Sequence, residues 1–544
     1  MRRGSITVFL ALALVLILSF VFSLLEGARV LCMKSRAQTV SDLCLQSMFG
    51  NYSTGLWEDY HLLFLDGTWQ EGEFSMEKFV QRAMVVTEEN LASAEGNLMD
   101  NAWDLTKMAP KDLAVGRYRL ATDGEGDVFL NQVRLWMQRE AVSDVLGELL
   151  SVKSQGETAE GQVKQKEEGW NAAWDALDRV KELKEQEADG QETKGQLKGN
   201  SDKRNVPGEQ ETNRQLTGDS DKWDVPGEQN ATGQPAGDSN KRDESEEPPQ
   251  AEMENPMDYV REVKASSVLS LVLKDPSQLS GKALADGNVL AKRQLAKGNW
   301  AEAPDSGLAD RLCLQYYIQN YFSNYVAECE KGAKEKVLSY EMEYIIGGKT
   351  SDSENLEKVV WELLGIREAM NLVTILQDTK KKELAYGIAA AAAGFTGLPL
   401  LVRAVQIGVL LAWAFVESVL DIRTLLEGKK VPFLKRTDQW SSDLSNCRKN
   451  LEEHSEGKEE GEGLTYNQYL QMLLFVLSPR TISYRCMDLM ERNEQIQMDA
   501  MIEAVEMTGT YQGRPLFWSM NFLTRQNWNS IVIPVSSSIT YGEN

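Results

Sequence analysis

Hydrophobic residues near the N-terminus form one unbroken run. Residues 5–25 contain no charged side chain, and Arg2 and Arg3 precede them. A helix of these 21 residues would be roughly 30 Å long, which is enough to cross a bilayer. No small-residue cleavage site of the A-x-A kind follows the run. We therefore expect it to stay attached as a transmembrane helix.

The same helix is expected to continue into water. Beyond residue 25, apolar residues recur at steps of three and four, which is typical of an amphipathic helix. We call this set the apolar stripe: Val30, Met33, Ala37, Val40, Cys44 and Met48. Such a stripe either contacts a partner helix or packs on the protein's own soluble body. The sequence leaves both uses open.

Most of the remaining chain has helical spacing. Helices are expected at about 76–101, 128–150, 308–333, 352–378 and 482–502. Ser351 and Glu354 have the spacing of a capping box at the start of the fourth of these helices.

Short stretches of alternating apolar and polar residues predict a few strands. They lie at 115–120, 338–346, 516–522 and 531–535. We expect 531–535 to pair with 338–346. The pattern as a whole predicts an α+β fold that is predominantly helical. A transmembrane helix continues into a long helix, and a helical ectodomain with a small β-sheet follows.

A second apolar region spans residues 384–420. Residues 384–402 carry no charge, but Arg403, Gln406 and Glu417 lie within or beside the part that follows. The region forms either a membrane hairpin or two helices in the core of a soluble domain. Charged groups at membrane depth are costly, which favours the buried helices.

Composition divides the chain into four parts. Residues 1–50 form the anchor and long helix, and 51–150 the first α+β part of the ectodomain. Residues 151–256 are polar and acidic, a helix at 151–186 stays open, and copies of one segment begin at Gly199, Gly218 and Gly237, an offset of 19 residues. These copies contain too few apolar residues to offset the entropy of ordering them, so we expect a disordered insertion. Residues 257–544 form the main helical α+β ectodomain.

Several segments carry a resemblance to a known family. Residues 3–10 (RGSITVFL) and 25–30 (LEGARV) resemble the start of minor pilins of Tad-type pilus systems, the TadE and TadG kind. More closely, they resemble a bacterial family of uncharacterised membrane-anchored proteins that begin this way. Residues 62–66, 340–349 and 411–421 resemble that family too. The resemblance covers most of the chain outside 151–256.

The resemblance implies a pilus or secretion setting without an established activity. It implies prepilin-type processing between Gly4 and Ser5, although Phe9 stands where pilin signals have Glu. Together with the uncleaved apolar run, it implies a single-pass protein of the cell membrane with its body outside the cytoplasm. The expected partners are the membrane and other pilin-like or pilus assembly proteins.

Composition limits the other functions. The chain is 42% hydrophobic with a net charge of −24, so nucleic acid is not expected as a partner. Six dispersed cysteines form no C-x-x-C, so neither a zinc site nor a thioredoxin-like site is predicted. Free cysteines in apolar packing are favoured over disulfides. No cofactor, metal or small-molecule substrate is expected.

Catalysis has little support in the sequence. The only histidines are His61 and His454, and no G-x-S-x-G, H-E-x-x-H or Walker motif occurs. Glu341 and Glu343 would point to one side of the predicted strand 338–346, about 6.5–7 Å apart. Such a pair could cleave a glycan, which makes an anchored envelope hydrolase the alternative. Ordinary acids on a solvent-facing strand explain the pattern better, so we expect a structural protein and no enzyme.

Overall fold

The computed structural model describes residues 3–92, 106–139, 256–284, 288–300, 308–329, 331–332, 336–458, 461–516 and 530–542. Its described part is a predominantly helical α+β protein with a small antiparallel sheet and a long N-terminal helix, which confirms the predicted fold class. The predicted insertion at 151–256 lies outside the described residues except for Pro256.

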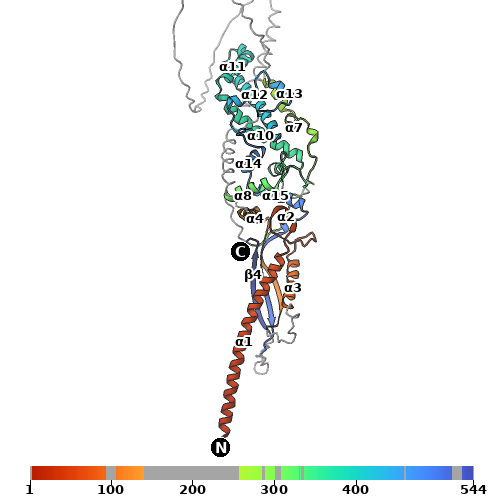
Figure 1. Ribbon diagram of the computed structural model, residues 1–544, viewed down its shortest axis with the longest axis vertical. Helices are drawn as coiled ribbons and strands as arrows, with labels where there is room; N and C mark the ends of the chain where they lie inside the picture. Colours follow the sequence, from red (N-terminus) through yellow and green to blue (C-terminus); the bar gives the residue numbers. More distant parts are fainter. Residues whose placement is uncertain are drawn as a thin grey trace, which may run out of the picture.

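Helix α1 (Arg3–Phe49) is one continuous helix of 47 residues. Its first half projects from the body, with the N-terminus at its free end (Figure 1). From Ile6 to Leu25 none of its residues is buried, whereas Glu26 and residues beyond it are buried at helical spacing. By length and composition α1 could cross a membrane once or act as a signal sequence.

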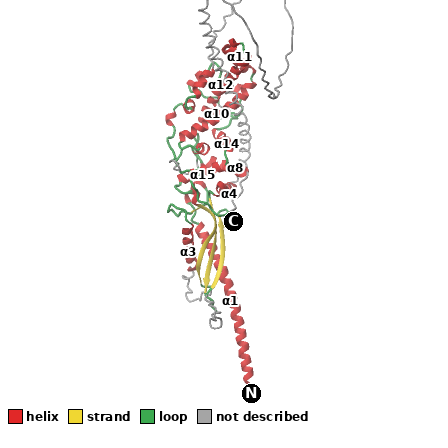
Figure 2. Ribbon diagram, turned by 180° about the vertical axis from the view of Figure 1, so that it is seen from behind, coloured by secondary structure: helices red, strands yellow, loops and turns green. Residues whose placement is uncertain are grey.

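Three long strands form most of the sheet, with β3 (Met501–Gly513) in the centre. β2 (Met108–Leu120) and β4 (Ile531–Thr540) pair with β3 on either side, both antiparallel. The short β1 (Leu65–Asp66) also pairs with β3. The sheet lies between the projecting helix and the helical body (Figure 2).

One face of the sheet is covered by α1 and α3 (Met76–Ala92). Along the second half of β3, Met507 and Tyr511 are buried while Thr508 and Gln512 are exposed, the alternation of a strand with one wet face. Gly513 lies on the buried face, where an added Cβ would overlap the end of the Met33 side chain. The absence of a side chain there lets α1 approach the sheet closely.

The helical body packs around α12 (Pro399–Leu426), which contacts α10 (Asp352–Gln377) and α11 (Thr379–Ala393). Its other helices are α2 (Thr54–Tyr60), α4 (Asp127–Arg139), α6 (Pro256–Lys264), α7 (Val268–Val272), α8 (Leu308–Tyr321), α9 (Glu341–Gly347), α13 (Cys447–Glu452), α14 (Tyr466–Val476) and α15 (Pro479–Asn493). From Val409 to Leu426 every residue of α12 is buried. The region 384–420 is thus a helical hairpin whose second helix lies in the core of the body.

Two of the predicted strands are confirmed and one is wrong. Residues 115–120 and 531–535 lie within β2 and β4, and 517–522 lie outside the described residues. The segment 338–346 contains the short helix α9 instead, so 531–535 pairs with β3 rather than with it. All residues of α9 are buried, and a segment buried on every side carries no readable period.

The predicted helices exist, but several end early. The helix expected at 308–333 ends at Tyr321, and the one at 482–502 ends at Asn493, before β3 begins at Met501. Ser351 accepts a hydrogen bond from the Glu354 backbone N–H at the start of α10, which is one half of the predicted capping box, whereas the Glu354 carboxylate accepts from the Thr350 hydroxyl instead. Since β3 and β4 join β2 in one sheet, these two strands pack with the part assigned to 51–150.

Candidate functional site

The apolar stripe packs on the protein's own body. Met33, Ala37, Val40, Cys44 and Met48 are buried and Val30 is half-buried, against the face formed by β4, β3 and α3. The Cys44 thiol donates a hydrogen bond to the Ala83 carbonyl of α3, at 3.3 Å. Of the two uses left open by the sequence, the structure thus has the intramolecular one.

A salt bridge marks the point where α1 leaves the sheet. Arg29 Nη2 lies 2.9 Å from Glu26 Oε1, and both side chains are buried. Arg29 also donates to the Arg514 carbonyl, just beyond the end of β3, and Glu26 Oε1 accepts from the Leu516 N–H at 3.4 Å. These contacts tie the end of β3 to α1 directly after its exposed apolar segment. The predicted processing site, Gly4–Ser5, lies within the first turns of α1, and its cleavage stays a prediction.

Glu341 does not have the exposed position that the alternative hydrolase needs. It is fully buried at the start of α9. Its carboxylate accepts from the Ser323 N–H and from Asn493 Nδ2, each at 3.0 Å, and lies 3.0 Å from Lys336 Nζ. Burial raises its pKa, and the Lys336 charge opposes this effect. The side chain therefore holds the 323–329 loop rather than facing a substrate.

Glu343 is also fully buried. Its Oε1 accepts from the Tyr325 N–H at 2.9 Å and from the Tyr466 hydroxyl at 2.8 Å, while Oε2 has no hydrogen-bond partner among the described residues. Burial raises its pKa to about 7. The expectation of two solvent-facing acids on a strand is wrong, and with it the geometry proposed for glycan cleavage.

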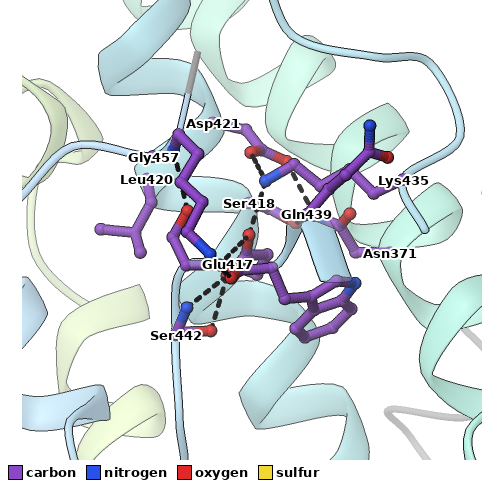
Figure 3. Close-up of polar contacts among 12 residues, drawn as sticks. Asn371, Glu417, Ser418, Leu420, Asp421, Lys435, Gln439, Ser442 and Gly457 are labelled. Atoms are coloured by element: carbon purple, nitrogen blue, oxygen red, sulfur yellow. Dashed lines mark hydrogen bonds and ion pairs between the residues drawn. The ribbon is translucent and has the colours of Figure 1, made fainter. Parts of the chain in front are cut away.

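The densest polar cluster lies inside the helical body, between α10 and α12 (Figure 3). We call it the core charge network: Arg367, Asn371, Glu417, Ser418, Asp421, Lys435 and Ser442. Lys435 Nζ lies 2.5 Å from Glu417 Oε1 and 2.5 Å from Asp421 Oδ1. The four charged side chains of the network are nearly or completely buried.

Each charge in the network has several partners. Arg367 binds Asp421 Oδ2 through Nε at 3.0 Å and Nη2 at 2.8 Å. Glu417 accepts from the Ser442 N–H and hydroxyl at 2.9 and 2.7 Å. Burial alone would lower the pKa of Lys435, but Asp421 and Glu417 raise it above its ordinary value. Two cations and two carboxylates make this network neutral, as buried charges require.

A further buried lysine lies beside the network without a hydrogen-bond acceptor. Lys381 Nζ has no partner among the described residues and is 3.5 Å from the ring centre of Trp440. The ring of Trp413 is 5.0 Å away. Burial lowers the pKa of Lys381 to about 8, although Glu417 and Asp378 act in the opposite direction. The two indole faces replace an anion as the neighbours of this ammonium group.

A cavity of about 790 Å³ lies where the end of α1 meets the helical body, and residues 50–55, 66–72 and 494–497 line it. Its lining includes Asp66 and Glu494 but no basic residue. Burial and a hydrogen bond with Asp59 raise the pKa of Glu494 to about 7. Gln70 and Gln495 have left-handed φ angles of 63° and 55°. The cavity fits a neutral or cationic polar molecule better than an anion.

The cysteines and the metal-binding residue types form no site in the described part of the chain. All six cysteines are free, as the sequence favoured, and Cys44, Cys447 and Cys486 are buried. No group of three or more His, Cys, Asp or Glu side chains among the described residues could hold a metal ion.

Sequence reasoning missed both the core charge network and the cavity. One signal for the network was present: Glu417 and Asp421 are four residues apart on an otherwise apolar helix, which places them on one face. The cavity draws on three distant segments of polar residues, and no local pattern joins them.

These features define the class of the protein: a helical α+β body carried on a long helix whose first half is apolar and exposed. Residues 246–513 match a family of unknown function, DUF5702. No curated protein and no solved structure matches the chain. The match includes the helices from α6 to α15 and strand β3, but not α1, α2 or α4. The resemblance of the N-terminal helix to Tad-type minor pilins therefore stays a prediction.

Proposed function

We propose that this protein is a membrane-anchored, extracytoplasmic structural subunit of a Tad-type pilus or a related secretion or envelope assembly. The observation that carries the proposal is the division of α1 into two halves. Its first half exposes large apolar side chains, among them Phe9 and Leu16, and its second half packs on an antiparallel sheet. A membrane helix that continues into a helix fixed on a soluble body is the arrangement expected of a pilin-like subunit.

The packing of α1 also limits how such a subunit would assemble. Because the apolar stripe is covered by the body, contacts with other subunits would use the exposed segment 6–25 within the bilayer. Helices in lipid associate through close packing of their side chains. A photo-crosslinking residue at Leu16 is expected to capture neighbouring membrane proteins, and the same residue at the buried Met33 is not. Equal capture at both positions would contradict this assembly mode.

The orientation can be tested with a natural thiol. Cys32 is exposed on α1, seven residues beyond the apolar run. In a Cys313→Ser/Cys329→Ser background, a membrane-impermeant maleimide should label Cys32 in intact, wall-stripped cells. The Cys32→Ser version of this variant is the control, since the remaining cysteines are buried. Labelling that appears only after permeabilisation would place the body in the cytoplasm and refute the proposal.

A further inference from the structure

The hairpin formed by α11 and α12 leaves large apolar side chains in solvent. It lies at the end of the described part of the chain opposite the N-terminus (Figure 1). The exposed side chains are Leu384, Tyr386, Leu398, Leu400 and Ile407. Leu400, in the first turn of α12, is 87% exposed. Leu398 and Leu400 lie two residues apart at the turn, and exposed apolar side chains grouped on the surface of a soluble body mark an interaction site.

The charge of this hairpin is opposite to that of the protein as a whole. The chain carries a net charge of −24, yet residues 379–403 contain four basic residues and one acidic residue, Glu383. Arg403 is exposed and lies about 6 Å along α12 from Pro399. An amphipathic element that enters a lipid surface does so to a depth of about 5–10 Å. Arg403 would then lie at the level of the phosphate groups, where a basic side chain is favoured.

Some polar groups of the turn between the two helices have hydrogen-bond partners within the turn. Thr396 Oγ1 donates to the Ala393 carbonyl at 2.7 Å and accepts from the Leu398 N–H at 3.2 Å. The Leu398 carbonyl accepts from the N–H groups of two later residues, and Pro399 has no N–H to satisfy. Backbone that enters lipid must have such internal partners, whereas a turn in water does not need them.

We propose that the tip of this hairpin inserts into an anionic lipid surface. Because the hairpin and the apolar half of α1 lie at opposite ends of the described part of the chain (Figure 2), this surface is not the membrane that α1 would enter. The protein therefore bridges two lipid surfaces. The bridging rests on the anchor in the proposed function, but binding of the hairpin to lipid does not.

The test uses the full chain in vesicles of phosphatidylcholine. Dye-labelled, protein-free vesicles of phosphatidylcholine and phosphatidylglycerol are added, and the dye that co-sediments is measured. Leu398→Asp/Leu400→Asp should reduce the captured dye roughly tenfold or more, because two exposed leucines no longer enter lipid. Val476→Asp replaces an exposed apolar residue of α14 and should leave capture unchanged. Lys380→Glu/Arg403→Glu, at two exposed positions, should remove the preference for anionic vesicles.

Three results would overturn the proposal: unchanged capture by the Leu398→Asp/Leu400→Asp variant, equal capture of purely phosphatidylcholine vesicles, or capture only when the dye-labelled vesicles also carry the protein. The last result would assign the hairpin to contact between two copies. Failure of the proposed anchor gives a different result, because the protein would then not float with the phosphatidylcholine vesicles into which it was placed. In that case, flotation of the protein with added anionic vesicles would test the binding of the hairpin to lipid directly.

Discussion

Replacing Lys435 by methionine is the sharpest test of the core charge network. Lys435 Nζ lies 2.5 Å from both Glu417 and Asp421, with the three side chains almost completely buried. After the substitution, Arg367 is the only cation for two buried carboxylates, and it contacts Asp421 alone of the two. Leaving one buried charge without its partner costs about 3–5 kcal/mol. We expect the free energy of unfolding to fall by that amount near pH 7.

Urea unfolding of the full chain in mild detergent measures this loss. Trp413 reports on the site, because its indole N–H donates to Ser442 in the network. Lys429→Met is the matched control. Lys429 also binds two carboxylates, Glu427 and Glu456, but it is exposed at the surface. Solvent screens such pairs, so the control should change stability far less.

Lowering the pH should reduce the loss of folding stability in the Lys435→Met variant. Lys435 is the first of the two charges that lower the pKa of Asp421 against the effect of burial, so removing it raises the folded-state pKa of that carboxyl group. A carboxyl group shifted in this direction destabilises the fold above its unfolded pKa, and the penalty disappears as the pH falls toward that value. Adding Glu417→Gln should recover part of the lost stability. A loss no larger than in Lys429→Met, with no dependence on pH, would refute the account of the network.

Three further predictions follow from single contacts. Glu343→Gln should stabilise the protein by about 1–3 kcal/mol at pH 8 and have no effect at pH 4. The pKa of Glu343 is raised to about 7, so the cost of burying its charge accumulates from the unfolded pKa up to about pH 7. An equal effect at pH 4 and pH 8 would contradict this. Lys381→Met should stabilise by on the order of 1 kcal/mol at pH 7, with the gain vanishing above the unfolded pKa of lysine; thermal unfolding against pH measures it, and destabilisation at pH 7 would show that the indole contacts outweigh burial. Gly513→Val should separate α1 from the sheet, seen as faster hydrogen exchange in the second half of α1, and adding Met33→Ala should restore protection; protection unchanged in Gly513→Val would show that α1 does not need this close approach.

The elements that could be predicted from the sequence are those that lie between two different environments, such as protein and solvent. Residues 6–25 are not buried against the body, and their length as an apolar run identifies them. The part of α1 that carries the apolar stripe has one buried and one solvent-exposed side, and its helical period identifies it. β2 and β4 are readable for the same reason, because one face of the sheet is exposed. Residues 501–505 of β3 and all of α9 are buried throughout. Because these segments are buried on every side, no alternation of apolar and polar residues distinguishes strand from helix there.

The candidate site was harder to predict than the fold. Glu417 and Asp421 stand out on an apolar helix, but their partners Arg367 and Lys435 lie in other segments of the chain. Glu341 and Glu343 were placed together by an assumed strand period. The buried helix turns them toward different partners, Lys336 and Tyr466. Such pairings depend on how distant segments pack, which a local pattern does not contain.

The central strand of the sheet comes from the far end of the chain, and this orders events during biosynthesis. About 450 residues separate Met48 from Met501, and at typical synthesis rates they take roughly 20–90 s to make. During that interval the N-terminal helix is already available to enter the bilayer, while the complete sheet that covers its second half does not yet exist. A holding factor or a neighbouring helix would have to shield those side chains in the meantime. A truncation that stops before β3 should therefore yield an anchored but aggregation-prone product.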